Sequence, residues 1–392
     1  MTKVARETDE SAKGRILRVV VATWFPDDPD RPRGGVEAVS ATLVRALAAI
    51  PLDVTVFTFS KSVRTATVQQ WGGVSIHREP QPPGSMLKLA RGAGRRRVAA
   101  FVERIGPDVV HAHDTFGIMA AHLSRPRVLT IHGFIHGDTL VGGGRYPRIR
   151  SVMWRRAEHE AWAAFPFVIS ISPYVRERLS GIARGRIVDI ENPIAPLFFD
   201  RPHEETPHVI FSAGIICRRK NTLGLVEAVA HLHRRGIPAR LRLAGGTTEP
   251  PYLAHVEARI KSLGLQESVE ILGPCGVDRI VLELEQAALF ALVSREENAP
   301  LGIQEAMAVG VPVVASNRCG MPYQIRDGET GLLVDPEDPA DIAARCAELL
   351  GDAGFRRSAS TRARQEARAR FSPEVVAART LRTYRMAAEI SG

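Results

Sequence analysis

The sequence contains few cysteines and none of the groupings that bind zinc. Its 392 residues include four cysteines, which lie far apart and form neither a C-x-x-C pair nor a cysteine–histidine cluster. We therefore expect reduced thiols, as in a cytoplasmic protein. The cysteines are Cys217, Cys275, Cys319 and Cys346.

Long apolar segments are also missing. No stretch reaches the roughly 20 apolar residues that a membrane-spanning helix needs. The first residues carry acidic and basic side chains without an apolar segment, so we expect neither a signal peptide nor a transit peptide, but a loose tail. These absences predict a cytoplasmic protein that meets a membrane, if at all, at its surface.

Positive charge is in excess, with a formal net charge of +9. A nucleic acid, an anionic membrane surface or phosphorylated small substrates would each suit this charge. The basic runs are not interleaved with aromatics in the pattern that stacks bases, so we expect no nucleic-acid partner. An anionic acceptor or a membrane surface stays open. The densest basic residues are Lys88, Arg91, Arg95, Arg96, Arg97, Arg145, Arg148, Arg150, Arg155 and Arg156.

Short β-branched segments alternate with longer helical patterns along the whole chain. They include LRVVVAT, DVVHAHD and RVLTIHG in the first half, and HVIFSAG, RLRLAGG and VPVVAS in the second. This alternation predicts α/β domains with parallel sheets covered by helices on both faces. Several segments end in Gly, His, Ser or Asp, and ligands bind at the carboxyl ends of the strands in such sheets. We expect the reactive groups at one edge of each sheet.

A proline-rich segment divides the chain into two sets of strands. Residues 191–207 contain four prolines and interrupt the periodic pattern. We place the interdomain linker there, between a first domain over residues 1–195 and a second over residues 205–372. Residues 373–392 carry apolar side chains at helical spacing and could pack on either domain.

The most informative segment is SREENAPLGIQEAMAVGVPVVAS. It holds Glu297 and Glu305, separated by seven residues, and we place Glu305 in the first turn of the apolar helix that follows. A glutamate at such a position, beside a loop with free backbone N–H groups, can hold sugar hydroxyls while the helix start favours phosphate. A lone glutamate there usually only complements the helix dipole. The paired spacing and the segment after it favour a nucleotide-sugar site.

These residues resemble glycosyltransferase family 4, whose signature is an acid, seven residues and a glutamate in EAMA-G-PV. The resemblance extends over nearly the whole chain and includes GGVE at 34–37, TIHG at 130–133, RRKN at 218–221 and RDGETGLLV at 326–334. It implies a retaining, metal-independent GT-B enzyme with two Rossmann-like domains facing each other across a cleft. The first is then the acceptor domain and the second the donor domain, and the C-terminal helix packs back on the first.

The resemblance also implies a role for each matching residue. Glu305 would bind the ribose hydroxyls, and Glu297 with the loop after it would hold the donor sugar and diphosphate. The predicted donor-binding residues are Gly34, Gly35, Arg219, Asn298, Ala299, Pro300, Leu301 and Glu305.

Three residues are predicted to be catalytic: His113, Lys220 and Glu297. Breaking a glycosyl phosphate bond builds negative charge on the diphosphate, and a fixed cation such as Lys220 lowers that barrier. Without the resemblance, Lys220 would be read as a solvated loop residue and His113 as a hydrogen-bonded core residue. In retaining enzymes of this type the leaving phosphate accepts the acceptor's proton, so the resemblance implies no dedicated carboxylate base. The metal-independent GT-B plan further implies no metal and no cofactor, with the nucleoside diphosphate sugar as the donor substrate.

The sequence departs from the family at two places. The family usually has an arginine directly after the glycine of the first strand in the second domain, where Ile215 follows Gly214. Arg218 and Arg219 are the candidates to supply the missing phosphate contact. The second departure is the segment 298–300, where glycine and an aromatic residue are common, so the donor sugar stays open.

Three functions therefore compete. The leading one is transfer of a sugar from a UDP- or GDP-sugar to a saccharide, a lipid-linked glycan or a small molecule. A catalytically weak homologue that binds a nucleotide and regulates a partner is the alternative, because of Ile215. A dinucleotide-dependent oxidoreductase is disfavoured, because the first strand is not followed by G-x-G-x-x-G with an acid about 20 residues later.

Overall fold

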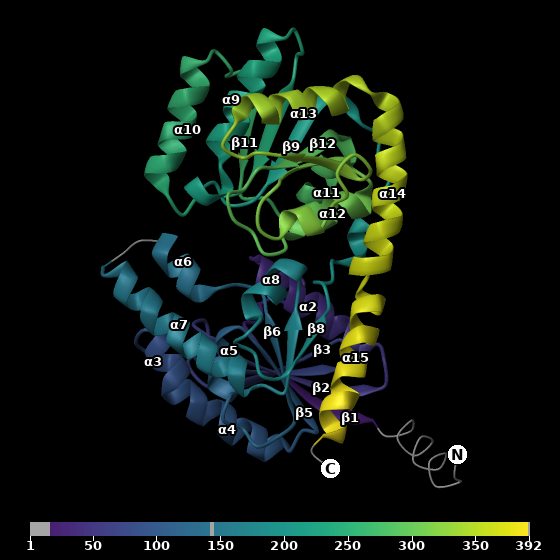
Figure 1. Ribbon diagram of the computed structural model, residues 1–392. Helices are drawn as coiled ribbons and strands as arrows, with labels where there is room; N and C mark the ends of the chain where they lie inside the picture. Colours follow the sequence, from purple (N-terminus) through teal and green to yellow (C-terminus); the bar gives the residue numbers. More distant parts are fainter. Residues whose placement is uncertain (1–15, 142–144, 391–392) are drawn as a thin grey trace, which may run out of the picture. The chain divides into compact units, whose positions relative to one another are not determined.

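The computed structural model describes residues 16–141 and 145–390 (Figure 1). The tail expected at the start of the chain lies outside these residues. The chain divides into two compact units, one made of Met1–Ser170, Leu179–Ile190 and Ala377–Gly392 and the other of Ile171–Arg178 and Glu191–Val376. Ile171–Arg178 groups with the second unit because Ser172 donates a hydrogen bond to Asn298 O and Tyr323 donates one to Glu177.

The first unit is built on an eight-stranded sheet in the order β3-β4-β2-β1-β5-β6-β7-β8. Every neighbouring pair is parallel except β3 and β4, which are joined through two glycines at positive φ, Gly72 and Gly73. The strands are β1 (Leu17–Ala22), β2 (Leu52–Ser60), β3 (Thr67–Trp71), β4 (Val74–Pro80), β5 (Val109–His113), β6 (Arg127–Ile131), β7 (Phe167–Ser170) and β8 (Arg186–Asp189).

Helices cover this sheet, and one of them comes from the far end of the sequence. Tyr384 of that helix, α15, is fully buried, and its hydroxyl lies 2.7 Å from Nδ1 of His111 on β5. The C-terminal helix is therefore part of the core of the first unit. The helices of this unit are α2 (Gly35–Ala48), α3 (Met86–Arg91), α4 (Ala93–Ile105), α5 (Thr115–Ala120), α6 (Ile135–Val141), α7 (Pro147–Ala164) and α15 (Pro373–Glu389); α8 (Pro173–Leu179) begins in the segment that groups with the second unit.

The second unit contains a six-stranded sheet in the order β11-β10-β9-β12-β13-β14, with every neighbouring pair parallel. Because β9 and β12 lie at its centre, the loops after these two strands meet at the carboxyl edge of the sheet. The strands are β9 (Thr206–Ala213), β10 (Arg240–Ala244), β11 (Val269–Gly273), β12 (Ala287–Leu292), β13 (Val313–Ser316) and β14 (Gly331–Val334).

Two apolar cores lie on the opposite faces of this sheet. Ile210 of β9 packs into a core with α9, α10 and α13, whereas the next residue, Phe211, packs into a core with α11, α12 and α14. Successive side chains of a strand point to opposite faces, so both faces are covered, and the prediction of parallel α/β domains is confirmed. The helices are α9 (Thr222–Arg234), α10 (Pro250–Ser262), α11 (Val277–Gln286), α12 (Leu301–Val309), α13 (Pro339–Gly351) and α14 (Ala353–Phe371).

Candidate active site

Three of the predicted site residues meet in the second unit. Glu297, in the loop after β12, accepts a hydrogen bond from Arg219 at 2.6 Å and pairs with Lys220 at 2.7 Å through the same oxygen, Oε1. Arg219 and Lys220 belong to the 3₁₀ turn Arg218–Lys220 that follows β9, and Arg219 also donates to the carbonyl of Glu296 at 2.7 Å. All three side chains are largely buried. One acid therefore holds two cations at the carboxyl edge of the sheet.

Arg218 and Arg219 are placed differently, although they are neighbours in sequence. The Arg218 side chain is 70% exposed, pairs with Glu249 at 3.7 Å and lies over the ring of Tyr252. Arg219 points to the acid that also holds Lys220. Of the two candidates for the missing phosphate contact, Arg219 lies beside the predicted catalytic lysine.

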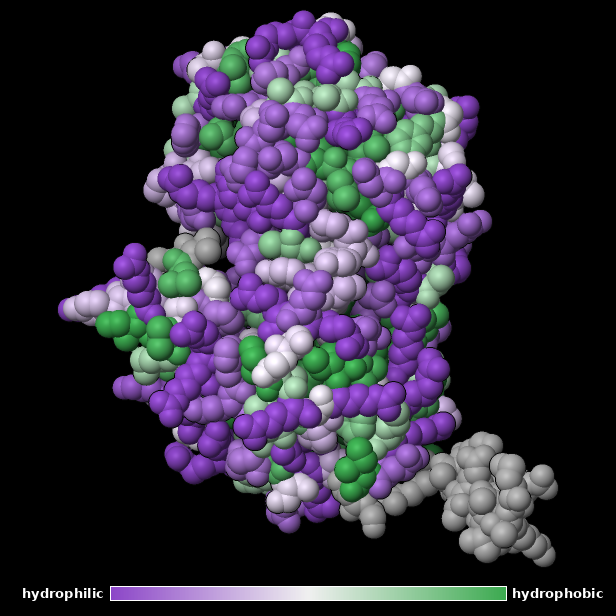
Figure 2. All heavy atoms as spheres, viewed as in Figure 1, coloured by the Kyte–Doolittle hydropathy of each residue, from purple (hydrophilic) through white to green (hydrophobic). Residues whose placement is uncertain are grey.

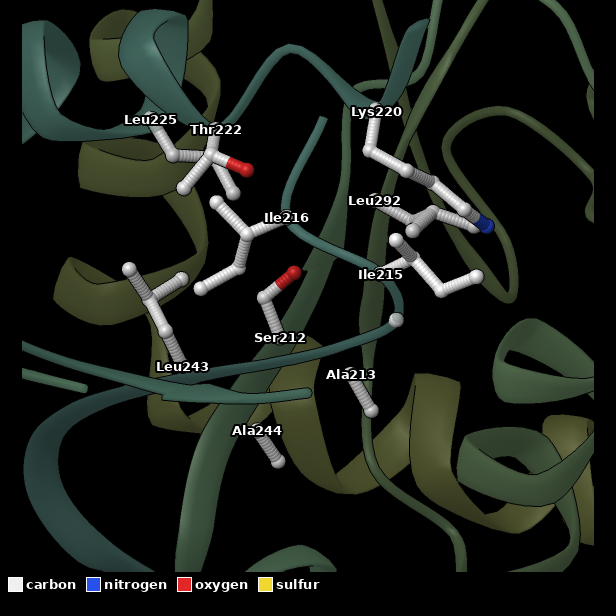
Figure 3. Close-up of a pocket in the computed structure, with 11 residues that line it drawn as sticks. Ser212, Ala213, Ile215, Ile216, Lys220, Thr222, Leu225, Leu243, Ala244 and Leu292 are labelled. Atoms are coloured by element: carbon white, nitrogen blue, oxygen red, sulfur yellow. The ribbon is translucent and has the colours of Figure 1, made fainter. Parts of the chain in front are cut away.

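A small pocket adjoins Lys220. It is open to solvent and holds about 280 Å³ of empty space, part of it open solvent, at the carboxyl ends of β9, β10 and β12 (Figure 3). Gly214 lies against the amine of Lys220, since a Cβ at this glycine would come within 3.4 Å of Nζ. Ile215 is 47% exposed and lines the same pocket as Lys220 (Figure 3). The position where the family usually has a cation is thus apolar and open.

The backbone between Glu297 and α12 is tightly fixed. Gly320 donates its N–H to the carbonyl of Glu297 at 2.8 Å, and a Cβ at Gly320 would lie only 1.7 Å from Asn298 O. Ala299, in the same loop, is buried.

The helix α12 begins directly after this loop. Pro300, the last residue before the helix, has an extended ψ of 127°, and Leu301 is the first residue of the helix. Within the described residues no side chain caps α12, so its first N–H groups are available to a ligand.

Glu305 lies in the second turn of α12, and the prediction that it lies in the first turn is wrong. The helix begins at Leu301, because Pro300 restricts the chain before it and residues 301–304 continue the same helix. The side chain of Glu305 is largely buried, and burial raises its pKa to about 7. Among the residues that the structure describes, it has no hydrogen-bond or ion-pair partner. Such an acid is suited to accept hydrogen bonds from a ligand.

In the first unit, His113 lies at the end of β5 among other histidines. Its Nδ1 is 3.1 Å from Nε2 of His132, and its ring lies with its centroid 4.5 Å from that of His111 at a tilt of 57°. Burial, with lesser contributions from the two neighbouring histidines, lowers the pKa of His113 well below its usual value. Its Nε2 is buried without a hydrogen-bond partner among the described residues. His113 is therefore neutral, with one ring nitrogen free.

The partners of His113 are residues to which the sequence assigned no role. His111 is held between Tyr384 and the hydroxyl of Thr130, each at 2.7 Å, and burial lowers its pKa to about 3. Asp114, with a positive φ of 44°, accepts hydrogen bonds from the backbone N–H groups of His132 and Gly133. The H-x-H-D spacing was an available signal, since residues two apart on a strand share a face.

The remaining predicted residues lie at the start of α2. Gly34 is the residue before the helix and Gly35 is its first residue. A Cβ at Gly34 would meet nothing within 4 Å, so a ligand can approach the backbone there. Glu37 in the first turn accepts a hydrogen bond from Arg33 N. The structure thus places Gly34, Gly35 and His113 in one unit and the other predicted site residues in the other unit.

The described residues hold neither a cluster of side chains that could bind a metal ion nor a helix that could span a membrane. Among residues 16–141 and 145–390, no group of three or more His, Cys, Asp or Glu side chains could hold a metal ion. Asp27 and Asp30, which superficially resemble paired metal ligands, interact with Ser60 and Arg45. No helix in the same ranges combines the length and apolarity that crossing a bilayer requires.

Comparisons with known proteins bear on the family of the chain. The family model "Glycosyl transferases group 1" matches residues 194–366, and "Glycosyltransferase Family 4" matches residues 33–196. The D-inositol 3-phosphate glycosyltransferase of Nocardioides sp. is 28% identical over 97% of this chain and 92% of that protein. The protein of the same name from Corynebacterium efficiens is 34% identical over 45% of this chain and 43% of its own length.

Solved structures show the same fold. Sucrose-phosphate synthase from Thermosynechococcus elongatus has a TM-score of 0.81 at 21% identity, covering 94% of this chain and 98% of that one. Anabaena HepE in complex with UDP and glucose has a TM-score of 0.70 at 18% identity, covering 94% and 99%. The two family models adjoin and together span residues 33–366. The predicted family is thus confirmed, and the chain belongs to glycosyltransferase family 4, the group 1 glycosyl transferases, with the GT-B fold of two Rossmann-like domains.

Proposed function

We propose that this glycosyltransferase moves a sugar from a nucleoside diphosphate sugar, with UDP or GDP as the nucleotide, to a hydroxyl acceptor with retention at the anomeric carbon. The observation that carries the proposal is the cluster in which Glu297 holds both Arg219 and Lys220. Its two cations exceed its one acid, so it attracts an anionic group. Anabaena HepE forms complexes with UDP and with UDP-glucose, which supports a nucleotide sugar as the donor.

The cluster suits the departure of a diphosphate. When the bond between the anomeric carbon and the phosphate oxygen breaks, the electron pair stays on the nucleoside diphosphate. Lys220 and Arg219 are already fixed by Glu297 and by the Glu296 carbonyl, so little reorganisation is needed to stabilise that charge. Arg219 then takes the place of the arginine that is absent at Ile215. Glu297 and the N–H groups at the start of α12 hold the sugar and the diphosphate.

Glu305 provides the second anchor. The 2′- and 3′-hydroxyls of a ribose are a pair of donors that would satisfy a carboxylate without a partner. Hydrogen bonds to the ionised form favour that form, so nucleotide binding should lower the pKa of Glu305 from about 7. Nucleotide binding therefore becomes tighter as the pH rises through 7.

We assign the unpaired Nε2 of His113 to a hydroxyl of the transferred sugar, because a neutral histidine can donate or accept there. The N–H of Gly35, at the exposed start of α2, binds the phosphate of the donor. The acceptor oxygen forms the new bond on the face that the phosphate leaves, and its proton passes to the phosphate oxygen. This reaction requires no metal and no cofactor.

A donor screen tests the proposal. Calorimetry with UDP, GDP and ADP identifies the nucleotide, and hydrolysis of the matching sugar nucleotide measures turnover. We expect Lys220→Met to lower turnover about 10² to 10³-fold, whereas Lys261→Met, at an exposed lysine of α10, should leave turnover unchanged. Nucleotide binding without turnover of any donor would favour a regulatory homologue, for which the exposed Ile215 is the structural argument. Absence of binding to all three nucleotides would refute both.

A further inference from the structure

Exposed apolar side chains are concentrated on α6 and α7 of the first unit. Eleven large hydrophobic side chains are exposed in the described residues, and five of them lie between residues 140 and 153. Figure 2 shows the hydrophobic residues as green spheres among purple ones over these two helices. The five are Leu140, Tyr146, Ile149, Val152 and Met153, each 50 to 62% exposed. Single exposed hydrophobics are ordinary, but a group of them marks an interaction site.

The apolar residues of α7 form a stripe that is separate from its buried face. Ile149, Val152 and Met153 follow the i, i+3, i+4 spacing that places side chains on one side of a helix. The face that packs on the first unit is made of other residues, including Trp154 and Trp162, which are 6% and 4% exposed. The core of the unit therefore does not account for the stripe.

Arginines lie beside the stripe, four of them on α7 and one, Arg145, just before the helix. The sequence from Leu140 to Ala157 contains five arginines and no acid, and all five arginines are exposed. Arg156 pairs with Glu160 at 3.0 Å, and Arg145 lies over the ring of Tyr146. The five are Arg145, Arg148, Arg150, Arg155 and Arg156. Together with the five apolar residues they form what we call the α6–α7 surface.

The two helices are firmly attached beneath this surface. The buried carboxylate of Glu158 accepts hydrogen bonds from the N–H groups of Ile135 and His136 and from the His136 ring. The hydroxyl of Ser151 donates to the carbonyl of His136 at 2.7 Å. These contacts join α6 to α7, so the exposed residues of both helices are presented together.

We propose that the α6–α7 surface docks on an anionic lipid bilayer. A helix with an apolar stripe and flanking arginines lies in the plane of such an interface, with its apolar side chains among the acyl chains and its cations among the headgroups. Each basic residue near an anionic leaflet strengthens binding about fivefold. The surface also directly follows β6 and His132, which contacts His113. If the proposed function holds, a lipid-borne acceptor would thus be delivered near the edge that carries His113.

Two other occupants fit the surface less well. A second copy of the chain, related by a twofold axis, would place the same patch against itself and bring the arginines of both copies together. A nucleic acid would suit the charge, but single strands are bound by stacking on several aromatic rings. Tyr146 is exposed here, whereas Trp154 is buried. A bilayer suits both the charge and the apolar stripe.

Vesicle sedimentation of the full chain tests the proposal. The assay needs neither nucleotide nor turnover, so its outcome is separate from that of the donor screen. We expect binding to vesicles of phosphatidylcholine mixed with phosphatidylglycerol and much weaker binding to phosphatidylcholine alone. Neutralising three arginines should weaken binding about 100-fold, whereas the same charge change at three exposed arginines elsewhere in the first unit should have little effect. The test variant combines Arg145→Gln, Arg148→Gln and Arg155→Gln, and the control combines Arg184→Gln, Arg382→Gln and Arg385→Gln.

The apolar stripe is tested separately. Changing its three residues to serine should weaken binding at least tenfold, whereas serine at three exposed apolar positions elsewhere should not. The test variant combines Ile149→Ser, Val152→Ser and Met153→Ser, and the control combines Ile16→Ser, Val68→Ser and Leu282→Ser. Equal binding by test and control variants would overturn the proposal. Absence of vesicle binding would overturn it as well. An RNA gel shift that the arginine variant abolishes would then identify a nucleic acid as the occupant, and a dimer in sedimentation equilibrium that this variant abolishes would identify a second copy of the chain.

Discussion

Replacing Glu305 by glutamine should stabilise the protein while it weakens nucleotide binding. Glu305 of α12 is largely buried, and among the described residues its carboxylate has no hydrogen-bond or ion-pair partner. The rise of its pKa from 4.5 to about 7 corresponds to about 3 kcal/mol. Glutamine has nearly the same shape and carries no charge, so Glu305→Gln removes the cost of burying the charge.

The sign of this effect depends on pH. The folded-state pKa lies above the unfolded one, so between about pH 4.5 and 7 the folded chain holds a proton that the unfolded chain has lost. The contribution of Glu305 to the free energy of unfolding is fully present below pH 4.5 and is lost as the pH rises through 7. At pH 8 the variant should be about 3 kcal/mol more stable than the wild type, and at pH 4.5 nearly equal to it.

Calorimetric scans at several pH values measure this effect. For a unit of about 190 residues, 3 kcal/mol corresponds to a rise in Tm of roughly 6 to 12 °C. Glu257→Gln, at an exposed acid of α10, is the matched control and should shift Tm by much less. Nucleotide binding of Glu305→Gln should be weaker and should lose its increase through pH 7. An equal gain in Tm at both pH values, or a loss at pH 8, would refute the reasoning.

Three further predictions concern other parts of the site. Lys220→Met should lower turnover of the donor far more than it lowers nucleotide affinity, because Lys220 stabilises charge that develops as the bond breaks. Steady-state kinetics and calorimetry measure the two effects, and a loss of affinity as large as the loss of turnover would contradict this prediction. Tyr384→Phe should destabilise the first unit by about 1 to 3 kcal/mol, since Nδ1 of His111 loses its 2.7 Å partner; an unchanged denaturant midpoint would contradict this. Gly320→Ala should weaken donor binding at least tenfold, because its Cβ would meet Asn298 O at 1.7 Å; unaltered calorimetric affinity would show that the loop can move without cost.

The sequence by itself determined the local features of this protein. Alternating β-branched and helical segments predicted parallel sheets covered on both faces, because a strand buried on both sides needs a nearly continuous apolar run. The pair Glu297 and Glu305 and the RRKN segment predicted the donor site and the family, and the family is confirmed. The first-turn position of Glu305 was the local error, since helix boundaries are the feature that a sequence pattern fixes least well, to within about two to four residues.

Only the tertiary structure decided which of these residues meet. The strand order places β9 beside β12, so Arg219 and Lys220 reach Glu297 from 77 to 78 residues away. Tyr384 reaches His111 across 273 residues. The raised pKa of Glu305 likewise depends on burial in the folded chain. The periodicity of apolar residues shows which face of a helix or strand is buried, whereas strand order and loop packing decide what lies against that face. These contacts set the charge and the chemistry of the site.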